Sequence, residues 1–313
     1  MRRPRALACP ASLKGVLPAP KAATALAEGL REWAEPVELP IADGGEGTLE
    51  VLHAALGGEW RTADVHDAFG RSRRARWLEW QDGTALVEAA EAIPLDPTRL
   101  DPLAASSRGL GELVRAVGRP TRLVVCLGGT ANMDAGVGMR EVVDELPAPT
   151  RVACDVHVPL YDAPHLFGPQ KGASPEQVAE LEARFLALAE LAPYAGERGA
   201  GAAGGLGAAF AALGATLVPG ASFVLDELGF DPAPFGLVIT GEGVVDRTTG
   251  RGKAPGEVYA RCVPTRVPLV IFGGRVETEF AGAATVALSG DPARAREDLV
   301  ELGADARRFS RSF

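Results

Sequence analysis

The chain has 313 residues, of which 47% are hydrophobic and 23% charged, a composition typical of a soluble globular protein that is large enough for two domains. Its formal net charge of −9 argues against a nucleic-acid-binding surface, so a phosphate site would have to be local. The four cysteines and four histidines are scattered, which argues against a zinc site and a disulfide framework and favours reduced cysteines in a cytoplasmic protein.

Two stretches bear on membrane targeting. The basic start, residues 1–15, lacks the long apolar core of a signal peptide. Residues 202–225 carry no charge and are long enough to span a bilayer, but they contain five glycines and Pro219. A buried helix followed by a turn is the better interpretation, so we expect no membrane partner.

The chain begins with alternating strand and helix patterns. We expect strands over 5–10 and 37–42 and helices over 20–35 and 49–56, with Thr48 as a helix cap.

The pattern changes after residue 58. Residues 59–67, 72–81 and 84–93 resemble strands separated by glycine-containing turns, as in a meander or a pair of hairpins. Further along, the spacing predicts strands over 122–127 and 151–158 and helices over 110–117, 175–191 and 205–213. Ser174 is the expected cap of the helix over 175–191.

The strand and helix alternation returns from residue 237. The expected strands are 237–240, 269–272 and 284–288, and the expected helices are 255–261 and 291–302. Because the two ends of the chain share one pattern, we predict an α/β fold with a discontinuous parallel-sheet domain, residues 1–58 and 231–313. A second α/β domain, residues 59–230, would interrupt it, with the motif loops facing each other across a cleft.

Three apolar, strand-like runs open into loops of glycines, carboxylates and hydroxyls. Their sequences are PIADGGEGT (40–48), LVVCLGGTANMDAGVGM (123–139) and LVITGEGVVDRTTGRGKAPG (237–256). Ligands of open α/β sheets bind beyond the carboxyl ends of the strands, and glycines let backbone N–H groups approach a phosphate. A simple glycine-rich turn is the alternative, but the convergence of several polar residue types favours a binding site.

Lysine usage points to the same loops. Only four of the 32 cationic residues are lysines, and Lys14, Lys171 and Lys253 each adjoin a glycine. A lysine is a compact charge that suits a phosphate in a narrow pocket, whereas arginine is planar and bulkier. We favour a functional role for Lys14 and Lys253 first, and then for Lys171.

Two short glycine motifs resemble nucleotide-binding signatures, but each lacks a feature that its signature requires. The spacing of Gly199, Gly201 and Gly204 matches a dinucleotide fingerprint, but no apolar strand precedes it. The stretch RTTGRGKAP, residues 247–255, lacks the first glycine of a P-loop and has Ala254 where Ser or Thr is needed. If the protein binds ATP, it uses neither motif.

Carboxylates lie at or near the ends of several predicted strands. Paired carboxylates can hold Mg²⁺ through water, and one of them can orient or deprotonate an attacking hydroxyl. The candidates are Asp43, Glu46, Asp134, Asp155, Glu242 and Asp246. Glu88 lies in an otherwise apolar run, and a solvated strand face explains it about as well as a site does.

Together these loops resemble the type I glycerate kinase family, in the same order from Ser12 to about Gly256. The matching pieces are SLKG (12–15), ADGGEGT (42–48), GGTA (128–131) with Asp134, CDV (154–156) with PL (159–160), FGPQKGA (167–173), residues 199–207, and ITGEG (239–243) with Asp246, Thr248, Gly252, Lys253 and Pro255.

The resemblance implies ATP- and Mg²⁺-dependent phosphorylation of a hydroxyl of D-glycerate, usually to 2-phosphoglycerate. It also implies a flavodoxin-like domain interrupted by a second α/β domain. On this hypothesis the catalytic residues are Lys14, Asp43, Asp134, Asp246 and Lys253, with Asp43 and Asp246 as metal ligands or orienting groups. The expected substrate- or nucleotide-binding residues are Ser12, Gly44, Gly45, Glu46, Thr48, Gly128, Gly129, Thr130, Asn132, Asp155, Gln170, Lys171, Gly241, Glu242, Gly243 and Thr248.

The chain also departs from the family pattern. The family usually has Asn where Met133 and Val158 stand, and Gln where Arg247 stands. Phe is usual at Leu13, and the segment over 139–151 is shorter than usual. Two lost amides remove hydrogen-bonding groups, so two alternatives stay open: a non-catalytic sugar-acid or nucleotide sensor on the same fold, or a kinase for another small hydroxy acid. An oligomer is compatible with the sequence.

Overall fold

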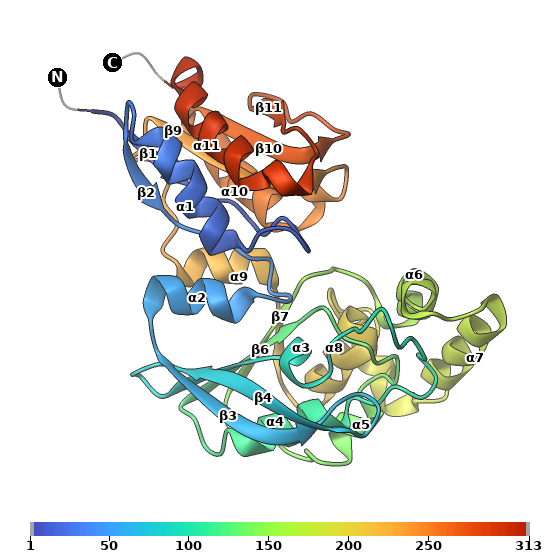
Figure 1. The fold of residues 1–313 in the computed structure, drawn as a ribbon. Helices are drawn as coiled ribbons and strands as arrows, with labels where there is room; N and C mark the ends of the chain where they lie inside the picture. The colour runs from blue at the N-terminus through green and yellow to red at the C-terminus, as the bar shows by residue number, and fades with distance from the viewer. Residues whose placement is uncertain (1–2, 311–313) are drawn as a thin grey trace. The chain divides into compact units, whose positions relative to one another are not determined.

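The computed structural model describes residues 3–310 and divides the chain into two compact units. Unit 1 comprises Met1–Asp43, Glu50–Leu56 and Val224–Phe313, and unit 2 comprises Gly44–Leu49 and Gly57–Phe223. Each unit contains its own β-sheet with helices packed on it (Figure 1), so the predicted α/β class is confirmed. The stretch Gly44–Leu49 groups with unit 2, although it lies within residues 1–58. The predicted domain bounds themselves stay a prediction.

Unit 1 is built on a five-stranded sheet in which every neighbouring pair is parallel. Its strands are β1 (Arg5–Ala8), β2 (Glu35–Glu38), β9 (Leu237–Val245), β10 (Leu269–Val276) and β11 (Ala284–Ala287). The order across the sheet is β11-β10-β9-β1-β2. Numbered within the unit, this is the 2-1-3-4-5 order of flavodoxin-like sheets, with its switch point between β1 and β9.

Helices cover this sheet and connect its strands. They are α1 (Ala19–Leu30), α10 (Ala254–Cys262), α11 (Ala295–Asp305) and the short η4 (Thr249–Arg251), η5 (Val263–Thr265), η6 (Pro292–Arg294) and η7 (Ala306–Phe309). Two further helices, α2 (Thr48–Leu56) and α9 (Gly220–Glu227), are each divided between the units, whereas the other two passages follow Asp43 and Leu56. Apolar side chains of α1 and α11 bury one face of the sheet, including Leu26 and Leu299 against Ile239 and Phe272.

Helices α1 and α11 cross with their backbones in contact, and two glycines make this possible. A Cβ atom on Gly29 would lie 2.0 Å from the carbonyl oxygen of Val300, and one on Gly303 would lie 2.4 Å from that of Leu26. Neither helix can accept a side chain at the crossing without moving away from the other.

We expect Gly29→Ala to lower the free energy of unfolding by about 3 kcal/mol, because the added methyl group must push packed backbones apart. Urea unfolding of the full chain measures this. The matched control is Gly196→Ala, whose added Cβ meets no atom within 4 Å. Equal stability of the two variants would contradict the close crossing of α1 and α11.

Unit 2 is built on a six-stranded mixed sheet in the order β3-β4-β5-β6-β7-β8. Its strands are β3 (Glu59–His66), β4 (Ser72–Glu79), β5 (Thr84–Glu88), β6 (Arg122–Leu127), β7 (Thr150–Cys154) and β8 (Thr216–Pro219). The pairs β3–β4 and β4–β5 are antiparallel, as the predicted meander requires, and the remaining pairs are parallel.

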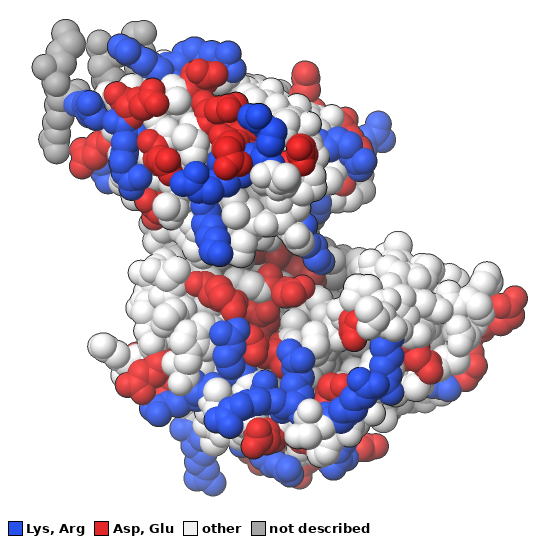
Figure 2. Space-filling model, in the orientation of Figure 1, with Lys and Arg blue, Asp and Glu red and all other residues white. Residues whose placement is uncertain are grey.

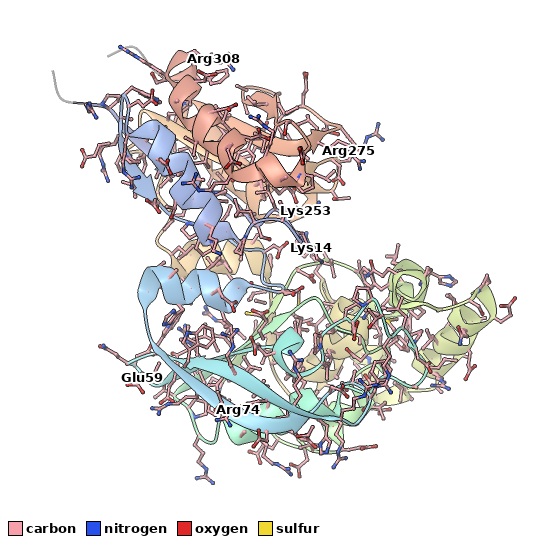
Figure 3. The ribbon with its side chains drawn as sticks, viewed as in Figure 1. Lys14, Glu59, Arg74, Lys253, Arg275 and Arg308 are labelled. Atoms are coloured by element: carbon pink, nitrogen blue, oxygen red, sulfur yellow. The ribbon has the colours of Figure 1, made fainter. Side chains whose placement is uncertain are left out.

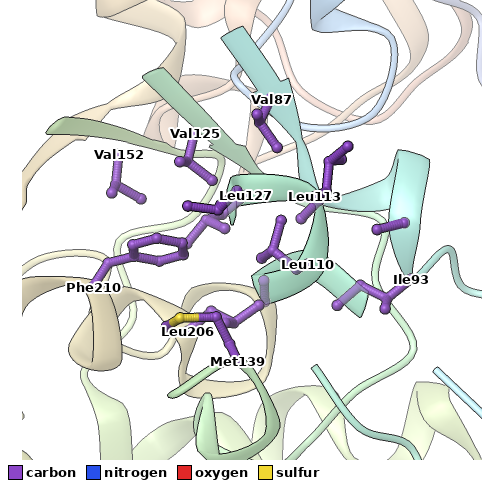
Figure 4. Packing of buried hydrophobic residues seen from close by; sticks show 14 of the residues in the cluster. Val87, Ile93, Leu110, Leu113, Val125, Leu127, Met139, Val152, Leu206 and Phe210 are labelled. Atoms are coloured by element: carbon purple, nitrogen blue, oxygen red, sulfur yellow. The ribbon is translucent and has the colours of Figure 1, made fainter. Parts of the chain in front are cut away.

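The parallel half of this sheet is buried by helices. Val87, Val125 and Val152, from three neighbouring strands, share a core with Phe210 of α8 and Leu110 of α4 (Figure 4). The helices of unit 2 are α3 (Ala89–Ala92), α4 (Arg108–Ala116), α5 (Val137–Arg140), α6 (Ala163–Phe167), α7 (Pro175–Leu186), α8 (Ala202–Ala212), η1 (Leu160–Asp162), η2 (Pro169–Lys171) and η3 (Ala189–Tyr194).

Several predicted bounds are wrong, each for a local reason. The strand predicted over 84–93 ends at Glu88, where the alanine-rich helix α3 begins. The strand predicted over 37–42 is Glu35–Glu38, because Glu35 pairs in register with Arg5 of β1. Strand β7 ends at Cys154, so Asp155 follows the strand and does not lie within it.

The ends of two predicted helices also differ. Helix α8 carries left-handed residues at Ala203, Gly204 and Gly205, whose φ angles are 49°, 68° and 91°, so its regular part starts after this kink. Helix α7 starts as predicted: Ser174 accepts a hydrogen bond from the Gln177 amide, and the Gln177 side chain accepts one from the Ser174 amide. It ends at Leu186, not at 191. Among residues 3–310, no helix combines the length and the apolar character needed to cross a membrane.

Candidate active site

A pocket of about 620 Å³ opens at the carboxyl edge of the unit 1 sheet. Its walls come from the segment after β1, the last residues of β9 and β10, the loop after β9 and the segment after β11. They include the switch point where open α/β sheets bind ligands. Five of the predicted site residues line it: Ser12, Lys14, Glu242, Gly243 and Lys253. The parallel sheet therefore collects predicted site residues that lie more than 200 positions apart in the chain.

Lys14 is presented on a tight turn. The amide of Leu13 donates a hydrogen bond to the Leu17 carbonyl at 2.9 Å, and the Val16 amide donates to the Leu13 carbonyl at 2.8 Å. The turn needs a left-handed residue, and Gly15 supplies it with φ of 74°. The result is an exposed ammonium at the end of a short, defined loop.

Lys253 stands directly before helix α10, and its side chain turns towards two carboxylates. Its Nζ lies 3.3 Å from Glu242 Oε2 and 3.8 Å from Asp246 Oδ1. Figure 3 places Lys14 and Lys253 on the same edge of unit 1, in agreement with their shared pocket. Two ammonium groups thus reach one cavity. On the face shown in Figure 2, by contrast, the Lys and Arg side chains of unit 1 are interspersed with Asp and Glu.

Glu242 is the buried carboxylate of this cluster. Burial raises its pKa above the ordinary value, and the neighbouring charge of Asp43 adds to the rise. A 2.7 Å hydrogen bond from the Thr249 hydroxyl and the ammonium of Lys253 oppose it. Without the Lys253 ammonium, less would oppose the effect of burial and of the Asp43 charge, so the pKa of Glu242 would rise further.

Asp246 shapes the loop in which it lies. Its Oδ1 accepts hydrogen bonds from the Thr248 amide at 2.7 Å, the Thr248 hydroxyl at 2.5 Å and the Thr249 amide at 3.2 Å. The Thr248 hydroxyl bond is the main reason why the pKa of Asp246 lies below its ordinary value. Asp246 and Thr248 thus bond to each other, and their predicted roles towards metal and substrate stay predictions.

The carboxylates around Lys253 offer hard oxygen ligands, which is what Mg²⁺ prefers. Within residues 3–310, no group of three or more His, Cys, Asp and Glu side chains has the arrangement of a metal cage. The predicted roles of Asp43 and Asp246 as metal ligands therefore stay predictions.

A second set of predicted residues gathers in unit 2, at the carboxyl ends of its parallel strands. A Cβ atom on Gly128 would lie 2.6 Å from both Asp155 Oδ2 and the Cα of Gly45. The loops after β6 and β7 and the loop over 44–48 therefore meet closely at Gly128. Glu46 lies at the same place, because a Cβ on Gly129 would be 3.1 Å from its carboxylate.

Glu88 lies in this region and is 3% exposed, so it is not on a solvated strand face. Its carboxylate accepts hydrogen bonds from the amides of Gly47 at 2.8 Å and Leu49 at 3.2 Å. These amides stand at the start of helix α2, where a negative charge is stabilising. Glu88 thus fixes the loop over 44–48. Thr48 was predicted to cap α2, but it is the first residue of the helix, and the Glu88 carboxylate accepts the hydrogen bonds of the cap instead.

Asp134 is a structural hub. Its carboxylate accepts five hydrogen bonds, from the Ser107 amide and hydroxyl, the Asn132 side chain and the amides of Gly136 and Gly138. These bonds tie the loop after β6 to the starts of α4 and α5. These hydrogen bonds give Asp134 a structural role in holding the loop, and its catalytic role stays a prediction.

Lys171 is 4% exposed, and it contacts the loop after β6. Its Nζ donates a 2.7 Å hydrogen bond to the backbone carbonyl of Asn132. Burial lowers its pKa from 10.5 to about 8, although Asp155 and Asp134 favour the charged form. The neighbouring Gln170 is exposed, so these two consecutive residues face different surroundings.

Three buried side-chain oxygens of unit 2 have no hydrogen-bond partner among the described residues: Thr48 Oγ1, Thr130 Oγ1 and Asn132 Oδ1. An unsatisfied buried oxygen costs free energy, so it marks a place for a water molecule or a ligand atom. Met133, directly after Asn132, is 1% exposed and packs with Leu160. Its side chain therefore belongs to the core, which accounts for an apolar residue at this position.

The two units divide the predicted residues between them. Unit 1 holds Ser12, Lys14, Asp43, Gly241, Glu242, Gly243, Asp246, Thr248 and Lys253. Unit 2 holds Gly44, Gly45, Glu46, Thr48, Gly128, Gly129, Thr130, Asn132, Asp134, Asp155, Gln170 and Lys171. Gly241 has a structural reason to be glycine, since a Cβ there would lie 2.2 Å from the Phe272 carbonyl.

Sequence reasoning missed the part of the pocket that follows β10 and β11. The missed lining residues of β10 and of the segment after β11 are Gly274, Arg275, Leu288, Gly290, Asp291, Pro292, Ala295 and Asp298. Val16, after β1, and Val244, in β9, were missed as well. A signal was present, because the apolar run of β10 is followed by Gly273 and Gly274, and Gly290 lies three residues after the end of β11. In a parallel sheet such strand ends share one edge with the other motif loops.

Comparison with known proteins identifies relatives over most of the chain. Residues 6–145 and 143–290 match the model of the glycerate kinase family. Glycerate 2-kinase of Escherichia coli K12 is 36% identical over 299 residues, which cover 79% of this chain and 78% of that protein. An uncharacterised protein of Mycobacterium bovis is also 36% identical, over 88% of this chain and 80% of its own length. The crystal structure of a candidate glycerate kinase 2 from Salmonella typhimurium LT2 aligns with a TM-score of 0.80 at 29% identity and covers 98% of both chains.

Proposed function

The chain belongs to the glycerate kinase family and is a kinase, and from this premise we propose that it transfers the γ-phosphoryl group of ATP to a hydroxyl of D-glycerate, giving 2-phosphoglycerate. The observation that carries the proposal is the pair Lys14 and Lys253 in one pocket at the carboxyl edge of the unit 1 sheet. Both substrates carry negative charge, and the chain has an overall charge of −9, so local cations are needed to bind them.

Phosphoryl transfer depends mainly on positioning and on neutralisation of charge. In the proposed mechanism Lys14 and Lys253 balance phosphate charge, and Glu242 holds the Lys253 ammonium in place through their 3.3 Å ion pair. Gly243 keeps a side chain away from the part of β9 that lines the pocket, so backbone N–H groups can approach phosphate oxygens there.

Asp43 and Asp246 would hold Mg²⁺ or orient the attacking hydroxyl. When bound, Mg²⁺ would neutralise charge on the phosphate oxygens. Asp43 is close enough to Glu242 for its charge to raise the Glu242 pKa, so the two carboxylates belong to one electrostatic cluster. Within unit 2, Thr130 and Asn132 would contact substrate or nucleotide, since their buried oxygens have no hydrogen-bond partner among the described residues. Reduced, buried cysteines at all four positions are in keeping with a cytoplasmic location, which is part of the proposal.

A coupled ADP-release assay with D-glycerate, ATP and MgCl₂ tests the proposed reaction. We expect turnover that stops when EDTA is added, and ³¹P NMR of the product should match 2-phosphoglycerate and not 3-phosphoglycerate. Binding of ATP or D-glycerate in calorimetry without any turnover would overturn the proposal in favour of a sensor. Turnover with another hydroxy acid in a substrate panel, but not with D-glycerate, would make the chain a kinase of different specificity.

A further inference from the structure

The unit 1 pocket has a floor without side chains. Gly243, Gly274 and Gly290 all line it, and they belong to β9, β10 and the loop after β11. A Cβ atom on Gly274 would lie 3.0 Å from the Gly243 carbonyl oxygen, and one on Gly290 would lie 3.4 Å from that of Gly274. The three glycines are therefore neighbours, and they form a continuous strip of exposed backbone across three strand ends.

The strip joins two chemically different ends. At one end, Gly243 adjoins the Lys14 turn, since a Cβ on Gly243 would lie 3.7 Å from the Lys14 amide nitrogen. Lys14, Lys253 and Glu242 make this end charged. At the other end, Leu288, Pro292 and Ala295 form an apolar wall where β11 leads into α11, and Asp291 and Asp298 line the pocket beside it.

The length of the pocket decides between the two substrates. Its lining runs from the segment after β1 to the segment after β11, which are three strand intervals apart in the sheet. At about 4.8 Å per interval, this distance is about 14 Å. A three-carbon acid cannot reach from one end to the other, and it would leave most of the 620 Å³ empty. A nucleoside triphosphate has both the length and the matching polarity, with phosphates at one end and a planar apolar base at the other.

We propose that the unit 1 pocket is the nucleotide site, with the phosphates at Lys14 and Lys253, the ribose over the glycine strip and the base against Leu288, Pro292 and Ala295. This assignment rests on the proposed kinase function for its choice of a triphosphate. It names the residues that select a nucleotide over a simple polyphosphate. The phosphate end supplies affinity for both kinds of ligand, and the apolar wall supplies affinity for the base alone.

The test compares MgADP with magnesium tripolyphosphate, measured by calorimetry on the full chain. In Leu288→Asp, we expect the Kd for MgADP to rise at least tenfold, because a charge replaces the apolar wall. The Kd for tripolyphosphate should stay within twofold, since it makes no contact there. The Michaelis constant for ATP should rise with the MgADP Kd, and that for D-glycerate should not. Leu186→Asp is the matched control, since Leu186 is an exposed leucine at the end of α7.

Leu288 packs partly against the core of unit 1, so Pro292→Asp provides an exposed second variant at the same wall. Unchanged MgADP affinity in both variants would overturn the assignment, and so would a rise confined to the Michaelis constant for D-glycerate. The two proposals fail separately. If the variants lose MgADP affinity selectively but the wild-type protein does not turn over D-glycerate, the proposed reaction is refuted and the nucleotide site is supported. If the wild-type protein turns over D-glycerate but both variants bind MgADP unchanged, the reaction is supported and the nucleotide site is refuted.

Discussion

Lys253→Met is expected to lower kcat/KM by about 10²–10³-fold in the D-glycerate assay, because the side chain supplies a positive charge where phosphate charge must be balanced. Loss of one such preorganised group in a pocket typically costs a few kcal/mol of transition-state stabilisation, which is this range of rates. Lys253 lies beside two carboxylates and is 30% exposed, so its replacement by methionine should leave unit 1 folded.

The pH dependence of the variant gives an independent check. The Lys253 ammonium lowers the pKa of Glu242, which burial and Asp43 raise. Without that ammonium, the Glu242 pKa rises further, so the acidic limb of the kcat/KM profile should move to higher pH in Lys253→Met. A variant that had lost activity through general damage would show a lower profile at an unchanged position.

Lys21→Met is the matched control, since it removes one ammonium from an exposed position on helix α1. It should retain the wild-type kcat/KM within twofold. If Lys253→Met also kept kcat/KM within tenfold of the wild-type value, the placement of phosphate charge at Lys253 would be wrong.

Local signals in the sequence were sufficient for much of the fold. The Ser174 cap was predictable because its hydrogen bond to the Gln177 amide is local, and the structure adds the reciprocal bond of a capping box. The return of strand and helix alternation after residue 237 led to the discontinuous parallel-sheet domain, because β9 and β10 begin with buried, strongly apolar runs. The flavodoxin-like type of the sheet came from the family resemblance. Strand 84–93 was predicted too long because the apolar run continues unbroken into α3, and periodicity cannot show where the chain turns into helix.

The surroundings of the site residues depend on contacts between residues that are distant in the sequence, and such contacts could not be predicted from the sequence. Glu88 binds amides 41 and 39 positions before it, and Lys171 binds a carbonyl 39 positions before it. Nothing adjacent to either residue in the sequence reveals such a partner. The glycines after β10 and β11 were visible, but their joint meaning depends on the strand order β11-β10-β9-β1. Local chemistry was thus predictable, whereas burial and pairing followed from topology.

Lys171 provides a second prediction of large effect, on stability. Its buried ammonium donates a hydrogen bond to the Asn132 carbonyl and lies near Asp134 and Asp155. These interactions hold the loop after β6 in place. We expect Lys171→Met to reduce D-glycerate turnover at least tenfold at pH 7, because the carbonyl loses its donor and the two carboxylates lose their compensating charge. The same losses should lower the free energy of unfolding by about 2 kcal/mol.

The pH dependence of this stability difference has a definite sign. The pKa of Lys171 is about 8 in the folded chain and 10.5 as the ordinary value, so between these pH values the unfolded chain binds more protons. The cost of burying the charge is fully present below pH 8, and it is relieved as the pH rises towards 10.5. The neutral amine still donates to Asn132. The stability of the wild-type protein relative to Lys171→Met should therefore increase over this window, by roughly 3 kcal/mol for a pKa lowered from 10.5 to about 8.

Urea unfolding of both proteins from pH 7 to 10.5 measures this difference directly. Groups that titrate in both proteins cancel in the comparison, and Lys21→Met corrects for the loss of one ammonium. A difference that stays flat, or that shrinks as the pH rises, would show that Lys171 is not held in an apolar interior. Because an ion pair on the surface would weaken with deprotonation, the sign of the slope separates a buried lysine that supports the loop from an exposed one that contacts substrate.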